Sequence, residues 1–106
     1  MALSESMAAY EDCYEIYERA ANDPKGVRVF AGDEKAAGIL QMRMNQARVL
    51  QRRESMRLYD RTDPAYGKSE FDKFRNAKRE DTEGNWWLYV EPWSSGELQI
   101  ESLSEV

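Results

Sequence analysis

Apolar residues near the start of the chain recur at alternating spacings of four and three, the pattern of one helix face. They are Leu3, Met7, Tyr10, Tyr14, Tyr17 and Ala21, with Cys13, Ile16 and Ala20 widening the stripe. The spacing predicts a helix over residues 4–21, capped by Ser4, with core-packed tyrosines whose hydroxyls reach the surface. The other face carries Glu11, Glu15 and Glu18. Proline and glycine within residues 22–26 end this helix.

The following segment predicts a short strand and then a long helix. Residues 27–30 are mostly β-branched or aromatic, which favours a strand. Asp33 is the expected N-cap of a helix that continues to about residue 59 without a proline. Its apolar residues form two strips, Ala36, Ala37, Leu40, Met44, Ala47 and Leu58 on one side and Ile39, Met42, Val49 and Met56 on another. Two strips indicate contact from two directions, by the chain's own domain and by a second copy.

The C-terminal half predicts a β-hairpin. Residues 73–80 and 86–91 form its strands, and residues 82–85 form the turn, with Gly84 supplying the positive φ. A capping box over residues 69–72 offers a short helix as the alternative for the first strand. Pro92 ends the pairing. Alternating apolar and polar residues over 97–101 permit a last edge strand.

The second hairpin strand is apolar on both faces. Trp86, Leu88 and Val90 share one face, whereas Trp87 and Tyr89 share the other. A strand of this kind is covered on both sides or offers one face to a partner. We assign Trp86 to the core. We expect Trp87, Tyr89 and the nearby Trp93 to form an exposed patch that binds another protein, because tryptophan and tyrosine are enriched at interfaces.

The chain of 106 residues has room for one domain, and 42% apolar residues suffice for one modest core. A single cysteine excludes an internal disulfide. No apolar run is long enough for a membrane span and no signal sequence is evident, so a cytoplasmic location is expected. We therefore expect a single α+β domain over residues 1–106. Two helices, one of them long, pack on a small antiparallel sheet that contains the C-terminal hairpin.

The residue types argue against an enzyme. The sequence has no histidine, which removes the commonest general base and the commonest metal ligand. It has no phosphate-binding, dinucleotide-binding or zinc-protease motif. Cys13 lies among apolar residues without a cation beside it, which indicates a buried side chain and no nucleophile. We expect no catalytic residues, no cofactor and no metal.

Charge is unevenly distributed along the chain, whose net charge is -5. Residues 1–40 carry an excess of acidic residues, residues 41–79 an excess of basic ones, and residues 80–106 have no lysine or arginine. The basic middle contains a row of arginines on the long helix, Arg48, Arg52, Arg53, Arg57 and Arg61. Guanidinium groups suit phosphates and carboxylates equally. The row either binds nucleic acid or is neutralised by the acidic ends of the same chain.

We favour neutralisation, because nucleic-acid modules usually carry a net positive charge and this chain does not. The resulting hypothesis is a small acidic accessory or inhibitor protein without enzymatic activity. Its protein-binding residues are Trp87, Tyr89 and Trp93 together with Glu11, Glu15 and Glu18. A short, acidic, histidine-free α+β chain is typical of bacteriophage and mobile-element accessory proteins. The alternative is a nucleic-acid binder that uses the five arginines. The first hypothesis also allows a homodimer through the long helix.

Overall fold

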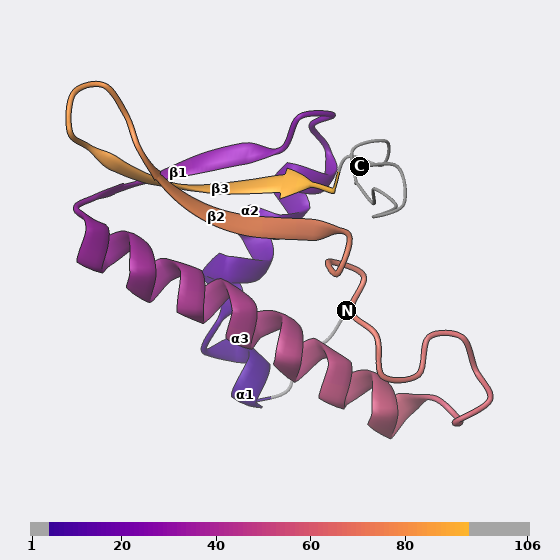
Figure 1. Ribbon diagram of the computed structural model, residues 1–106. Helices are drawn as coiled ribbons and strands as arrows, with labels where there is room; N and C mark the ends of the chain where they lie inside the picture. The colour runs from indigo at the N-terminus through magenta and orange to yellow at the C-terminus, as the bar shows by residue number, and fades with distance from the viewer. Residues whose placement is uncertain (1–4, 94–106) are drawn as a thin grey trace, which may run out of the picture.

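The computed structural model describes residues 5–93, which form one layer of helices on a three-stranded antiparallel sheet (Figure 1). The helices are α1 (Glu5–Ala8), α2 (Glu11–Ala21) and α3 (Glu34–Leu58). The strands are β1 (Val27–Gly32), β2 (Phe74–Glu80) and β3 (Trp86–Pro92), in the order β1-β3-β2. The predicted fold class is confirmed: α2 and the long α3 pack on a sheet containing a C-terminal hairpin. The expected strand over 97–101 and the Ser4 cap lie outside the described residues.

The first helix is interrupted, whereas one continuous helix was predicted. The Tyr10 amide donates to the Met7 carbonyl at 2.9 Å, and the Tyr10 carbonyl accepts from the Cys13 amide at 2.9 Å. Tyr10 therefore closes one short helix and opens the next. The turn lets Met7, which is fully buried, and the buried face of α2 enter the same core.

Helix α3 begins at the predicted cap. The Asp33 carboxylate accepts from the Ala36 amide at 2.7 Å, and the helix continues for 25 residues. The first apolar strip faces the core through Ala37, Met44 and Ala47. Leu58 was assigned to this strip, but it is 55% exposed because it is the last residue of a helix that runs past the sheet (Figure 1). The second strip stays largely exposed at Ile39, Met42 and Met56.

The predicted hairpin is present, and β3 is the central strand. β3 pairs with β2 from Phe74↔Pro92 to Glu80↔Trp86, and Gly84 has a φ of 84° in the turn. On its other side β3 pairs with β1, with a β-bulge between Phe30 and Gly32. The capping box over residues 69–72 does form, since Asp72 accepts from the Ser69 amide at 2.9 Å, but it closes a turn before β2 and starts no helix.

The core lies between the helices and the inner face of the sheet. Tyr17 stacks on Phe71 with 4.8 Å between ring centroids, and Phe74, Leu88 and Val90 are buried beside it. Trp86 was assigned to the core but is only half-buried, because it stands at the turn end of β3, opposite Glu80 and the bulged end of β1.

Buried polar groups in this core have partners on α3. The hydroxyl of Tyr14 donates to the Ala47 carbonyl at 2.7 Å, and that of Tyr17 donates to the Met44 carbonyl at 2.9 Å. These two tyrosine hydroxyls therefore join α2 to α3. The prediction that they reach the surface was wrong. Cys13 is fully buried, as predicted, and burial raises the pKa of its thiol to about 11.

A bidentate ion pair joins α3 to the loop before β2. Arg52 Nε and Nη2 donate to Asp72 Oδ1 at 3.0 and 2.5 Å. Burial alone would raise the pKa of Asp72, but the hydrogen bonds from Arg52 and from the Ser69 amide outweigh it and lower the pKa. Both side chains are about a third exposed, so solvent weakens the pair.

Asp72→Asn is expected to lower the free energy of unfolding by about 1 kcal/mol at pH 7. Because the pKa of Asp72 is lower in the folded state, its contribution is present above the unfolded value of 3.8 and is lost as pH falls through the folded value. Urea titrations at pH 7 and at pH 3 should show the difference between wild type and variant shrinking at low pH. Glu83→Gln, in an exposed turn, is the matched control; equal effects of both substitutions would contradict the assignment.

Candidate functional site

The sheet face that points away from α2 and α3 carries alternating aromatic and arginine side chains, and we call it the outer sheet face. Its members are Arg28 and Phe30 on β1, Trp87, Tyr89 and Glu91 on β3, and Arg75, Ala77 and Arg79 on β2. The register places Phe30 and Arg79 on either side of Trp87. Within residues 5–93, no helix covers this face (Figure 1).

Trp87 is held by three neighbours on this face. The Arg28 guanidinium lies 3.8 Å from its ring centroid, and the Phe30 ring meets it edge-on at 5.1 Å. Its indole N–H donates to Asp81 Oδ2 at 2.8 Å. That bond and one from the Asn85 amide lower the pKa of Asp81. Trp87 is therefore half-buried in one fixed orientation.

A second set of contacts fixes the part of the outer sheet face around Tyr89 and Glu91. Arg79 lies 4.6 Å from the Tyr89 ring centroid and donates to Glu91 Oε1 at 2.5 Å. Arg75 donates to the same oxygen at 3.1 Å and lies 5.6 Å from the Trp93 ring. The hydrogen bond from Arg79 is the main reason that the pKa of Glu91 is lowered. One carboxylate thus positions two arginines over two aromatic rings.

The predicted aromatic patch is therefore only partly open. Trp93 is 54% exposed, whereas Trp87 and Tyr89 are half-buried beneath arginines. Phe30 is 58% exposed and belongs to the same face, although it was absent from the predicted set. The alternation over residues 27–30 does place Arg28 and Phe30 on one side of a strand. Only the pairing of β1 with β3 brings them beside Trp87.

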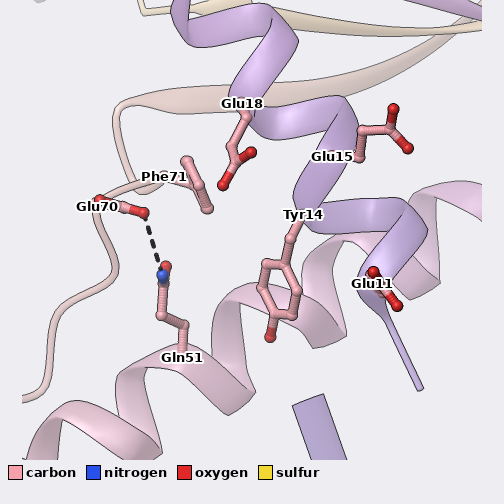
Figure 2. Close-up of a pocket in the computed structure, with 7 residues that line it drawn as sticks. All are labelled: Glu11, Tyr14, Glu15, Glu18, Gln51, Glu70 and Phe71. Carbon is pink, nitrogen blue, oxygen red and sulfur yellow. Dashed lines mark hydrogen bonds between the residues drawn. The ribbon is translucent and has the colours of Figure 1, made fainter. Parts of the chain in front are cut away.

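The carboxylates of α2 lie on a different surface, the helical side of the sheet. Glu11, Glu15 and Glu18 line one wall of a cavity of about 310 Å³ (Figure 2). Its remaining lining residues are Tyr14, Gln51, Glu70 and Phe71. The predicted protein-binding residues therefore form two separate surfaces, with the aromatic ones on the outer sheet face and the acidic ones beside this cavity.

The cavity combines acidic side chains with aromatic rings. Glu18 extends towards Phe71, and Gln51 reaches from α3 towards Glu70, to which it donates at 3.5 Å (Figure 2). Glu15 also accepts from Arg19 at 3.1 Å on the same helix. This composition suits a cationic group. Among residues 5–93, no three side chains of the metal-ligating types come together as a metal site.

The five arginines of the predicted nucleic-acid surface differ in their surroundings. Arg48 donates to the Phe74 carbonyl at 2.6 Å and is partly buried, and Arg52 is paired with Asp72. Arg57 is paired with Glu54 on the same helix. Arg53 and Arg61 are exposed, and within the described residues neither has an ion-pair or hydrogen-bond partner. The row is thus interrupted and does not form a continuous cationic surface.

The basic middle does form ion pairs with the acidic ends, but at other residues. Arg43 pairs with Asp12 of α2 at 2.6 Å, and Lys78 lies 3.6 Å from Glu34. Arg75 and Arg79 pair with Glu91, as described above. The arginines of the helical row instead find carboxylates within the basic segment itself. The helical row is therefore neutralised mostly within the basic segment, whereas the basic residues of β2 pair with the acidic segments before and after it.

No family model, curated protein or solved structure matches this chain. Across residues 5–93, every helix is too short or too polar to cross a membrane. The geometry of the surfaces therefore supplies the functional argument.

Proposed function

We propose that the protein is a non-enzymatic binding module that recognises another protein through its outer sheet face. The observation that carries the proposal is the cluster of Phe30, Trp87, Tyr89 and Trp93 with three arginines on a face that no described helix covers. Tryptophan, tyrosine and arginine are the residues most enriched among those that dominate binding energy. The same proposal extends to a cytoplasmic accessory or inhibitor role. A bacteriophage or mobile-element origin stays a sequence-based hypothesis.

The arginine contacts favour this use of the face. Arg28 over Trp87 and Arg79 over Tyr89 hold the rings in fixed orientations before any partner arrives. Side chains that are already ordered lose less conformational entropy on binding. The more exposed rings, Phe30 and Trp93, supply apolar area at the two sides of this ordered centre. The face thus has a preorganised centre and an apolar periphery.

The double variant Phe30→Ala, Trp93→Ala is expected to lose the partner while staying folded, because both rings are more than half exposed. Loss of two interface aromatics should cost about 2 kcal/mol or more, which is roughly thirtyfold in Kd. Affinity capture from cells that encode the protein, followed by titration with the captured partner, measures this loss. Leu58→Ala, which truncates a similarly exposed side chain at the end of α3, is the matched control. Equal capture by all three proteins would refute the proposal.

Nucleic-acid binding is the second candidate, and the exposed Arg53 and Arg61 favour it. It is weaker, because Arg48 and Arg52 are committed to the Phe74 carbonyl and to Asp72. Titration with duplex and single-stranded DNA at increasing salt separates the two candidates. Phosphate binding requires an affinity that falls steeply with salt and is weakened by Arg53→Ala.

Self-association through α3 is an addition to the first candidate. Ile39, Met42 and Met56 are exposed at heptad-like spacing, which suits a second copy of the helix. The polar Gln46 and Arg53 interrupt the same strip and weaken a pairing of this kind. Sedimentation equilibrium of the wild type and of Met42→Glu tests it directly.

A further inference from the structure

The two edges of the sheet are not equivalent. At the β2 edge, Arg48 Nη1 donates to the Phe74 carbonyl at 2.6 Å and Gln41 Nε2 donates to the Asn76 carbonyl at 2.9 Å. Side chains of α3 therefore occupy two of the acceptors that another strand would use. Exposed strand edges attract further strands, and covering them is a common protection. The β2 edge is closed in this way at Phe74 and Asn76.

The β1 edge has no equivalent cover among the described residues. On β2, the Phe74 and Asn76 carbonyls point away from β3, so their β3 partners Pro92 and Val90 direct their own peptide groups towards β1. In the register of β1 with β3, it is therefore the peptide groups of Val27 and Val29 that bond to β3. The peptide groups of Arg28 and Phe30 then point outward. No side chain in residues 5–93 bonds to them, and both residues are exposed.

A groove runs along this open edge. It has a volume of about 560 Å³ and lies between β1 and α2. Its lining residues are Asp12, Glu15, Ile16, Arg19, Val27, Arg28, Val29 and Phe30. Asp12 is paired with Arg43 and Glu15 with Arg19, so the charges of the helical wall are internally neutralised. Ile16, Val27, Val29 and Phe30 supply its apolar surface.

We propose that an extended segment of the partner protein adds to β1 as an antiparallel fourth strand. The proposal rests on the proposed function and specifies how the partner is held. Main-chain hydrogen bonds to Arg28 and Phe30 would supply affinity, and the flanking side chains would supply selectivity. The groove beside β1 leaves room for the side chain that an added strand must direct inward.

The side chains beside the edge define the chemistry of that segment. The residue opposite Val29 points into the groove against Ile16, and must be apolar. The residue opposite Arg28 lies on the outer sheet face. Arg28 forms no ion pair within residues 5–93 and stacks on Trp87, so an acidic residue complements it. The residue opposite Phe30 is aromatic or aliphatic. Because the added strand runs antiparallel to β1, its sequence from N- to C-terminus is an apolar residue opposite Phe30, an apolar residue opposite Val29 and an acidic residue opposite Arg28.

A blocked synthetic peptide, Thr-Thr-Phe-Val-Glu-Thr-Thr, is the probe, titrated into the full-length protein by calorimetry and by NMR. The Arg28 and Phe30 amides should become protected from hydrogen exchange. N-methylation of the peptide's phenylalanine and glutamate amides, which face β1, should weaken binding at least tenfold. N-methylation of the valine amide, which faces away, is the matched control and should leave affinity unchanged.

Two protein variants separate the backbone from the charge. Arg28→Ala keeps the outward amide and loses the cation, whereas Arg28→Pro loses both without removing a bond to β3. We expect Arg28→Pro to bind the probe at least tenfold more weakly than Arg28→Ala. Since proline can perturb β1, the N-methylated peptides give the same test on an unaltered protein.

Four outcomes would overturn strand addition. The first two are no probe binding and probe binding that is insensitive to N-methylation. The third is probe binding that appears only after Leu98→Asp and Ile100→Asp, because the occupant of the edge would then be the chain's own tail. The fourth is a dimer that the probe dissociates, because the occupant would then be a second copy of the chain. Partner capture that is lost in the Phe30→Ala, Trp93→Ala variant would still support the proposed function in each case. The two proposals therefore fail separately.

Discussion

Gly26→Ala should destabilise the protein by about 3 kcal/mol. Gly26 has a φ of 83°, and a Cβ built there would lie 2.2 Å from the Val90 carbonyl oxygen and 2.7 Å from the Glu91 Cα. The positive φ alone costs a non-glycine residue about 1–3 kcal/mol. The methyl group must also push the loop away from β3, which weakens the Val27↔Val90 pair at the start of the β1–β3 ladder.

Gly84→Ala isolates the first part of that cost, the backbone strain. Gly84 has a φ of 84°, but the nearest atom to its Cβ would be Glu80 Oε2 at 4.0 Å. Only the backbone strain applies there, and we expect a loss of about 1–2 kcal/mol. Chemical denaturation followed by circular dichroism measures both variants. If Gly84→Ala proved as costly as Gly26→Ala, the close approach of the loop to β3 would be refuted.

The second large effect is expected at Tyr17, the largest fully buried side chain among the described residues. Tyr17→Ala should lower the free energy of unfolding by about 3–5 kcal/mol, because it leaves a cavity between Phe71 and Phe74. A domain of this size is stable by only about 5–15 kcal/mol. The variant should therefore unfold at a markedly lower urea concentration.

Tyr17→Phe keeps the ring and removes only the hydroxyl. That hydroxyl donates to the Met44 carbonyl and accepts from Asn76 Nδ2 at 2.8 Å. Asn76 Nδ2 also donates to Asn45 at 2.8 Å, so it keeps a partner in the variant. We expect a loss of about 1 kcal/mol. Similar losses for the two substitutions would mean that the hydroxyl, and not the ring, supports this part of the core.

Local sequence signals were sufficient for most helices and strands. These signals act within a few residues, so they can be recognised without tertiary structure. They are Asp33 as a helix cap, Gly84 in the hairpin turn and the β-branched residues of β1. The break at Tyr10 was missed for the opposite reason. Tyr10 continues the four-three spacing, and only the burial of Met7 against residues distant in sequence requires the turn.

The candidate site was predictable only in part. Alternation along β3 put Trp87 and Tyr89 on one face, which needs no knowledge of the sheet. The same alternation extends to Glu91, but Arg28 and Arg79 lie on other strands, and only the strand order and register bring them beside Trp87 and Tyr89. The interruption of the arginine row could not be predicted, because helical spacing says nothing about Asp72 or the Phe74 carbonyl, which come from the loop before β2 and from β2 itself.

The burial of Cys13 gives the molecule an internal reporter. Its thiol is enclosed in the first turn of α2, and its raised pKa keeps the reactive thiolate scarce at neutral pH. Alkylating reagents can therefore reach it only when α2 separates from α3 or when the whole protein unfolds. The rate at which the cysteine is labelled measures that opening under native conditions. A ligand that stabilises the β1–α2 side of the fold would be detected as slower labelling, without any engineered probe.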